Sequence, residues 1–165
     1  MTYCKTCELI SRRDANNAPL WDCIYRTQFW DVVHHNSTTL PGWLVLVIRR
    51  HIGAIDELTN EEAIELGILL HHVSLALKET TGCIKTYVVQ FAEMAEHQHV
   101  HFHIIPRMAN QPENRRGTNI FEYSGASEKE RVSEEAMNEI GMKVQKILIS
   151  SPSLADEKAR LKDEM

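Results

Sequence analysis

Three histidines recur at every second position of one short stretch, as His99, His101 and His103. The residues between them, Val100 and Phe102, are apolar. Because successive side chains of a β-strand point to opposite faces, a strand here would place the three imidazoles on one face. Imidazole transfers protons, attacks electrophiles and binds metal ions near neutral pH. The spacing therefore predicts a functional site and leaves two chemistries open: metal binding, or covalent catalysis in which a histidine attacks phosphorus.

Two cysteines near the start of the sequence, Cys4 and Cys7, form a Cys-x-x-Cys pair. Such a pair taken singly is compatible with a redox couple, a metal site or chance. The other two cysteines, Cys23 and Cys83, lack a motif and are expected to be buried apolar residues. The cysteines alone therefore do not decide between these chemistries.

The segments that must position these residues predict an α+β fold with a mainly antiparallel sheet. The clearest helix signal follows Thr59, where Thr59 and Glu62 fit a capping box and Gly82 would end the helix. Residues 11–19 are polar and predict a loop. The expected strands are Leu20–Tyr25, Gln28–His34, Trp43–Ile48, Ile84–Phe91, His99–Pro106 and Thr118–Tyr123, and the expected helices are Thr59–Thr81 and Ser133–Ile149.

The composition restricts the classes of partner. The chain has 165 residues and a net charge of −5, so no bulk positive charge favours nucleic-acid binding. The longest strongly apolar run, Leu44–Ile48, is far too short to span a bilayer. The beginning of the sequence has no basic-then-apolar secretory pattern. We therefore expect a cytoplasmic protein without nucleic-acid or membrane partners, whose cysteines are thiols or metal ligands.

The histidine stretch and the segment upstream of it resemble the histidine triad (HIT) superfamily of nucleotide hydrolases and transferases. The residues from His99 to Ile105 match the signature His-φ-His-φ-His-φ-φ, in which φ is an apolar residue. The residues from Pro41 to His51 are similar to the family's Pro-Gly-His-x-Leu-Val-x-Pro-(Lys/Arg)-x-His segment. The resemblance covers roughly residues 4–107 of the sequence.

The resemblance implies a fold and an assembly. The family fold is a five-stranded antiparallel sheet packed with one long helix, and the last predicted helix adds a C-terminal helix to it. We expect a single HIT domain over residues 1–150, with a core at 4–107 and an extension at 108–150, followed by a charged tail at 151–165. Members are commonly homodimers with a sheet that continues across the interface, so a homodimer is expected.

The resemblance also implies a reaction on a small-molecule nucleotide. The middle histidine, here His101, attacks the α-phosphate of an adenine or related nucleotide, such as a dinucleoside polyphosphate or a nucleoside phosphoramidate. Water or phosphate then releases the nucleotide from the nucleotidyl-histidine intermediate, while His103 donates a hydrogen bond to the phosphate oxygens. A nucleotide phosphorylase, a nucleotide-binding regulator with little turnover and a catalytic metal centre remain as alternatives.

A zinc site is implied for the Cys-x-x-Cys pair. In a subset of HIT proteins, and in the related galactose-1-phosphate uridylyltransferases, such cysteines hold a structural zinc with two histidines. Those histidines are the one after the Leu-Val strand and the first of the triad. The four corresponding residues here are Cys4, Cys7, His51 and His99. Two thiolates and two imidazoles leave no open position on a tetrahedral ion, so we expect one structural zinc per chain and no organic cofactor.

Four further residues are implied as nucleotide contacts. Gln90 falls late in the strand before the triad, where the family's diadenosine polyphosphate hydrolases have a glutamine that contacts phosphate; a surface glutamine without that role is the alternative. The family's ribose-binding Asp or Asn corresponds to His35, with Asn36 beside it. Arg107, directly after the triad strand, would supply positive charge to a polyphosphate.

Two positions depart from the family pattern. Many members have Gly-Gln-(Ser/Thr)-Val before the triad, whereas Glu96 stands at the register of the hydroxyl here. A carboxylate at that position repels phosphate unless it is protonated or turned away, and the hydroxyl that relays a proton in Hint-like phosphoramidases is missing. The family's Gly-His is Gly42-Trp43, and Trp43 is expected to pack in the core rather than line the base pocket.

Overall fold

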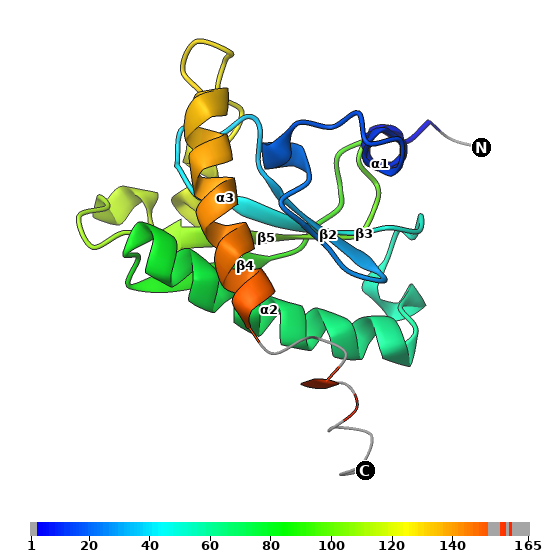
Figure 1. Cartoon of the computed structure of the whole chain (residues 1–165). Helices are drawn as coiled ribbons and strands as arrows, with labels where there is room; N and C mark the ends of the chain where they lie inside the picture. The colour runs from blue at the N-terminus through cyan, green and yellow to red at the C-terminus, as the bar shows by residue number, and fades with distance from the viewer. Residues whose placement is uncertain (1–2, 152–155, 158, 160–165) are drawn as a thin grey trace.

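A five-stranded antiparallel sheet forms the centre of the computed structural model, which describes residues 3–151, 156–157 and 159 (Figure 1). The strands are β1 (Tyr25–Arg26), β2 (Trp30–His34), β3 (Leu44–Ile48), β4 (Lys85–Val89) and β5 (His101–Arg107). Their order across the sheet is β1-β2-β3-β5-β4, and each neighbouring pair is antiparallel. The predicted fold class is therefore confirmed. The predicted tail at 151–165 lies mostly outside the described residues.

The two predicted helices begin where their caps place them. The helix α2 (Asn60–Thr81) has the expected capping box: the Thr59 hydroxyl accepts from the Glu62 N–H, and the Glu62 carboxylate accepts from the Thr59 N–H at 2.8 Å. Gly82 ends this helix in a left-handed conformation, with φ of +70°. The helix α3 (Glu134–Ser150) begins after Ser133, whose hydroxyl accepts from the Ala136 N–H.

Three expectations about local structure were wrong. A helix, α1 (Lys5–Asp14), begins directly after Cys4, includes Cys7 and continues into the first residues of the predicted loop. The strand expected from Leu20 is a 3₁₀ helix, η1 (Leu20–Asp22), followed by the short β1. The segment expected as a strand at 118–123 is also a 3₁₀ helix, η4 (Gly117–Tyr123). The helix α1 and the segment η4 pack against sheet residues that are distant from them in sequence. Local propensity does not encode such contacts.

Each face of the sheet has its own apolar layer. One layer joins β2, β3 and β5 to α2 and α3; Figure 1 shows these two helices crossing each other over the sheet. The other layer lies on the opposite face and includes Ile10 of α1 and Ile120 of η4. No helix in the described part of the chain is long and apolar enough to cross a membrane. The sheet is thus covered by long helices on one side and by shorter elements on the other.

Buried ion pairs hold α1 against the sheet. Arg13 is only 3% exposed, and its guanidinium contacts Asp22 at 2.7 Å and Asp31 at 3.3 Å. Asp31 lies on β2 and also pairs with Arg26 at 2.6 Å. Removing one partner of such a buried network leaves an uncompensated charge, which is strongly destabilising. These pairs therefore fix the position of α1, and with it the two cysteines at its start.

Candidate active site and metal centre

His101 and His103 lie side by side on the face of the sheet opposite α2 and α3. Their ring centroids are 5.0 Å apart, and both rings are partly exposed. The strand β5 begins at His101, two residues later than expected. In its pairing with β3, His101 is opposite Val47 and His103 is opposite Val45. His99 precedes the strand, and its ring points toward the two cysteines and His51. The spacing alone placed three histidines on one face. His101 and His103 form a pair there, whereas His99 lies apart from them, beside the residues with which the resemblance grouped it.

The hydrogen bonds of His101 identify its tautomer. The Nδ1 atom lies 2.7 Å from the backbone carbonyl oxygen of His99. A carbonyl oxygen can only accept, so Nδ1 carries the proton and Nε2 keeps its lone pair. Burial lowers the pKa of His101 below its usual value, which keeps the ring neutral at pH 7. A neutral imidazole with a free Nε2 lone pair is equipped to act as a nucleophile.

His103 has the complementary tautomer. The indole Nε1 of Trp43 lies 3.0 Å from its Nδ1. Indole nitrogen can only donate, so Nδ1 of His103 accepts and its own proton is on Nε2. Burial, with smaller contributions from His101 and His35, lowers the pKa of His103 to about 3. On the same face of the sheet, His101 therefore offers a nitrogen lone pair and His103 offers an N–H donor. Both rings are neutral.

The backbone before β3 holds Trp43 in place. Gly42 has a φ of +84°, and a Cβ there would lie 2.8 Å from the Cγ2 atom of Thr81. Both facts require glycine at this position. The Gly42 N–H donates to Nε2 of the buried His34 at 3.0 Å, and the Nδ1 of His34 donates to the carbonyl of His35. This chain of hydrogen bonds fixes the direction in which Trp43 enters the site.

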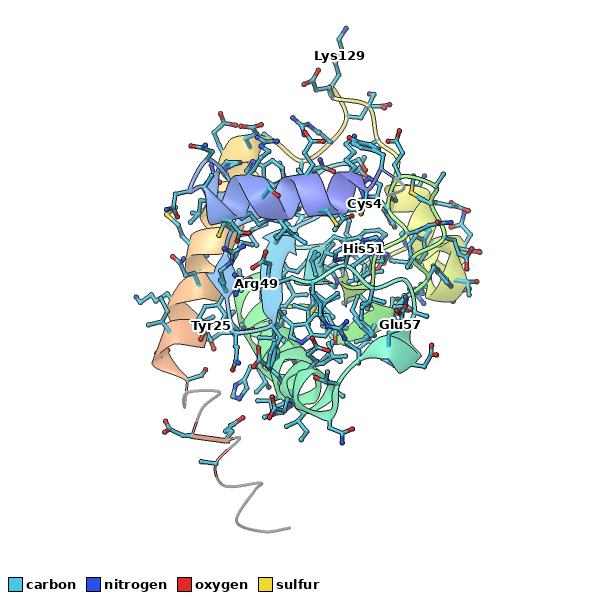
Figure 2. All side chains as sticks on the ribbon, turned by 90° about the vertical axis from the view of Figure 1, so that its right-hand side faces the viewer. Cys4, Tyr25, Arg49, His51, Glu57 and Lys129 are labelled. Atoms are coloured by element: carbon cyan, nitrogen blue, oxygen red, sulfur yellow. The ribbon has the colours of Figure 1, made fainter. Side chains whose placement is uncertain are left out.

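Cys4, Cys7, His51 and His99 converge at the start of α1. Their ligand atoms all lie within 4.8 Å of one another. The Nδ1 atoms of the two histidines are 3.3 Å apart, and the Cys7 sulfur lies 3.3 Å and 3.5 Å from them. Figure 2 shows Cys4 and His51 close together at this end of α1. The ligand set expected from the sequence is thus brought together.

The spacing of these atoms fits zinc. A tetrahedral zinc with bonds of about 2.05 Å to nitrogen and about 2.3 Å to sulfur separates two nitrogens by ~3.3 Å and a nitrogen from a sulfur by ~3.6 Å. Three of the four nitrogen–sulfur distances lie between 3.3 and 3.7 Å, and no two of the four ligand atoms are more than 4.8 Å apart. The Nε2 of His99 donates to the carbonyl of Ile48 at 2.6 Å, so its Nδ1 lone pair faces the cluster. The donor set and its geometry therefore suit a structural zinc ion.

The residues expected to contact nucleotide are placed unequally. The His35 ring lies 5.7 Å from that of His103, and its Nε2 is 2.8 Å from the Ser124 hydroxyl. Asn36 is exposed, and its backbone carbonyl accepts from Arg131 at 3.2 Å. His35 is therefore beside the histidine pair, while the side chain of its neighbour faces solvent.

The other two lie on strands that flank the pair. Gln90 follows β4 directly after Val89, which pairs with His103, so it is at the end of β4 nearest the site. Arg107 is four residues beyond His103 on β5, or ~13 Å along the strand. Its guanidinium contacts the carbonyl of Met108. Gln90 is thus close to the pair, and Arg107 is at the far end of β5.

An aromatic residue from the C-terminal extension also reaches the site. The Phe121 ring lies 5.6 Å from the ring of His103 and 5.4 Å from that of Trp43, nearly perpendicular to both. On its other side it lies 5.5 Å from Phe91, which follows β4. Sequence reasoning did not single out Phe121, because no local pattern in the extension indicates that η4 folds over β5. The extension thus forms part of the site.

The departure before the triad has a simple structural outcome. Glu96 is exposed, and its backbone carbonyl accepts from the Lys5 N–H at 2.9 Å. The next residue, His97, is half-buried, with its Nδ1 2.8 Å from the Thr6 hydroxyl. The carboxylate is therefore turned toward solvent, which avoids the repulsion that its sequence position suggested.

The sheet, the histidine pair and the adjoining Cys/His cluster define a protein of the histidine triad class. A family model, the HIT domain, matches residues 21–110, which is more than half of the chain. The chain belongs to the HIT family, as the sequence motifs predicted. Membership supports a nucleotide-binding role or a nucleotide hydrolase or transferase role. The comparison with curated proteins gave no match.

Solved structures share the fold at low sequence identity. A zinc-bound histidine triad family protein from Mycobacterium smegmatis is 15% identical, with a TM-score of 0.62, over 95% of this chain and 96% of its own. A Hit-like protein involved in cell-cycle regulation from Bartonella henselae is 20% identical, with a TM-score of 0.62, over 85% and 95%. A histidine triad protein from Marinobacter aquaeolei is 25% identical, with a TM-score of 0.63, over 77% and 88%.

Proposed function

We propose that this chain is a nucleotide hydrolase or nucleotidyl transferase that acts at the α-phosphate of an adenine or related nucleotide, such as a dinucleoside polyphosphate or a nucleoside phosphoramidate. The observation that carries the proposal is the pair of opposite tautomers at His101 and His103. One ring offers a nucleophilic lone pair, and the other offers a hydrogen-bond donor to the phosphate oxygens. A regulator that only binds nucleotide would not require the first of these features.

In the proposed reaction the Nε2 lone pair of His101 attacks the α-phosphorus and displaces the leaving group. The ring then carries both the nucleotidyl group and the Nδ1 proton, so it is positively charged. The carbonyl of His99 accepts that proton's hydrogen bond and stabilises the charge. The Nε2–H of His103 donates to a phosphate oxygen as charge accumulates. Water or phosphate next attacks the phosphorus, and the lone pair returns to His101.

The nucleotide contacts belong to the same proposal. His35 lies beside His103 and is proposed to face the ribose, with Asn36 next to it. Gln90, at the end of β4, is proposed to donate to the phosphate, since a neutral amide binds phosphate without trapping the product. Arg107 is proposed to act only on a long polyphosphate, because its position on β5 is ~13 Å from His103.

One structural zinc per chain is proposed at Cys4, Cys7, His51 and His99. When bound there, the ion would join the start of α1 to His99, two residues before β5. His99 then has two roles: its Nδ1 faces the ion, while its carbonyl orients His101. The rigidity of the nucleophile would depend on this connection. Thiolate ligands persist in a reducing compartment, so we also propose a cytoplasmic location.

The function is tested by incubating the purified protein with adenosine phosphoramidate, dinucleoside polyphosphates and nucleotide sugars, and by intact-mass spectrometry after rapid acid-free quenching. We expect a mass increase of one nucleotidyl group, located on His101, and release of nucleoside monophosphate. Release of a nucleoside diphosphate when phosphate is added would identify a phosphorylase instead. Tight nucleotide binding without an adduct or product for any substrate would reject the enzyme proposal in favour of a regulator.

A homodimer is proposed through the edge of the sheet at β4. This strand has one neighbour, β5, so its outer edge has unpaired backbone groups. Three apolar residues lie near this edge. Val88 of β4 is 48% exposed, and Ile84, just before β4, and Leu75, on α2, are similarly exposed. A groove of about 300 Å³ lies between α2 and β4. Pairing of two β4 edges around a two-fold axis would cover these residues and continue the sheet.

Val88→Lys is expected to convert the dimer to a monomer. In a two-fold interface the substitution places two lysines near each other and removes apolar contact, so dimer affinity should fall by at least ~100-fold. Light scattering coupled to size-exclusion chromatography measures the change. Met142→Lys, on the exposed side of α3, serves as the matched control and should remain dimeric. A wild-type protein that is monomeric at high concentration would refute the proposed interface.

A further inference from the structure

We infer that Trp43 is a positioning residue that fixes His103 as a hydrogen-bond donor unable to transfer its proton, and so restricts the site to substrates whose leaving group departs without protonation. Phosphoanhydrides are such substrates, because the leaving oxygen is stable as a phosphate anion. Phosphoramidates with an amine leaving group are not. The inference rests on the proposed function and narrows the two substrate classes named there to one, the dinucleoside polyphosphates.

The first step is the fixed contact between the two rings. Trp43 is fully buried, and a buried indole N–H needs a partner, which here is Nδ1 of His103 at 3.0 Å. The Trp43 and His103 rings are nearly perpendicular, at 84°, and Phe121 packs on both. His103 therefore has no room to turn its Nδ1 toward another donor without breaking this packing.

The second step concerns the proton that His103 holds. To protonate a leaving group, a neutral imidazole must give up its Nε2 proton and receive another at Nδ1, since the imidazolate anion is too basic to form at neutral pH. The indole of Trp43 cannot supply that proton, because its N–H is a donor of hydrogen bonds and not an acid in this range. His103 can therefore stabilise charge on the phosphate but cannot act as a general acid.

The third step considers the other imidazoles near the pair. His35 and His101 are the titratable groups that act on His103, and His101 is the proposed nucleophile. The Nε2 of His35 is already 2.8 Å from the Ser124 hydroxyl. His97 interacts with His101, and its Nδ1 is 2.8 Å from the Thr6 hydroxyl. His35 and His97 thus each have one ring nitrogen hydrogen-bonded to a side-chain hydroxyl, and Glu96 faces solvent.

The reaction balances for an anhydride without an acid. The Nε2 of His101 forms a bond to the α-phosphorus, and the bond to the bridging oxygen breaks with its electron pair left on that oxygen. The leaving phosphate is an anion and needs no proton. Water then attacks the phosphorus, the bond to Nε2 breaks with its pair returned to the ring, and a proton of that water passes to solvent. An amine would have to leave as an amide anion. The attack of His101 therefore cannot expel an amine unless another group donates a proton to it.

The test compares leaving groups. Zinc-containing protein is given aryl esters of adenosine monophosphate, whose phenols span a range of acidity, together with diadenosine triphosphate and adenosine phosphoramidate. We expect kcat/KM of the wild type to fall steeply as the phenol becomes less acidic. We also expect the anhydride to be preferred over the phosphoramidate by at least ~100-fold, since general acid catalysis is worth about this much or more. A shallow dependence with efficient phosphoramidate turnover would overturn the inference.

Substitutions at Trp43 provide the decisive comparison. Trp43→His places a ring that can carry a proton beside Nδ1 of His103, so it should flatten the leaving-group dependence and raise phosphoramidate turnover relative to anhydride by at least ~10-fold. Trp43→Phe fills similar space without the donor or a proton, and should leave the dependence steep. Equal dependence in the histidine and phenylalanine variants would overturn the inference, provided that both retain zinc and a cooperative unfolding transition.

A second variant guards against misfolding at the buried Trp43. His103→Gln keeps an N–H donor but cannot transfer a ring proton, so it should lose at least ~10-fold less anhydride turnover than His103→Ala. Equal losses in the two variants would show that proton transfer by His103 is needed. Phosphoramidate turnover that His97→Gln abolishes would assign the acid to His97 and also refute the inference. Absence of any nucleotidyl adduct, with every substrate, would instead reject the underlying function.

Discussion

Replacing His101 by alanine is expected to lower nucleotidyl transfer by at least ~10⁴-fold, because the variant has no atom that can form the covalent intermediate. The measurement is kcat/KM for diadenosine triphosphate, together with intact-mass spectrometry of the protein after substrate addition. The fold and the zinc content should remain, since the His101 side chain is partly exposed and its one hydrogen bond in the described structure is to the backbone of His99. Nucleotide binding should also remain.

Two controls separate loss of the nucleophile from general damage. His101→Gly leaves space for free imidazole, and imidazole added to the solution should restore part of the turnover without forming an adduct on the protein. His72→Ala removes a histidine from α2, on the opposite face of the sheet, and should retain wild-type turnover. Turnover that survives in His101→Ala at more than a few per cent would refute the covalent mechanism.

The spacing of the triad predicted the strand and the pair of histidines, because a period of two is encoded locally. It did not predict that His99 separates from the other two. That separation depends on where β5 begins, and β5 begins where β3 pairs with it: Val47 is opposite His101. The role of Trp43 was missed for the same reason. Its indole meets His103 only because the register of β3 against β5 brings residues sixty positions apart into contact.

The start and the extension of the chain show the limits of local pattern. The helix α1 has few apolar residues, and it is held by Arg13, which is paired with Asp22 and Asp31 of later segments. The segment η4 contains an alternation that resembles a strand, yet Ile120 and Phe121 pack onto the sheet face as a 3₁₀ helix. In both places tertiary contacts outweigh propensity, and the resemblance to a known family ended before the extension. Only the resemblance led to the expected set of metal ligands. No spacing rule connects the two cysteines to the two histidines, because they are far apart in the sequence.

The largest expected effect on stability comes from removing the zinc ligands. Cys4→Ser/Cys7→Ser should lower the zinc content from about one ion per chain to near zero, measured by atomic emission on dialysed protein. Binding of a structural ion contributes directly to folding free energy, so unfolding free energy should fall by ~3–5 kcal/mol, less than in a zinc finger because this chain has its own apolar layers. For a chain of this size the melting temperature should drop by ~6–20 °C.

The same double variant tests how the ion acts on the nucleophile. His99 faces the cluster through Nδ1 and holds His101 through its backbone carbonyl, so loss of zinc should also lower kcat while leaving KM largely unchanged. Cys23→Ser is the matched control, because Cys23 is half-buried and lies outside the cluster, and it should keep zinc, stability and turnover. A chelator should act slowly and in step with unfolding, whereas rapid loss of activity from folded protein would indicate a catalytic ion. Full zinc content in the double serine variant would show that the ion binds elsewhere, because oxygen ligands at both positions cannot replace two thiolates at comparable affinity.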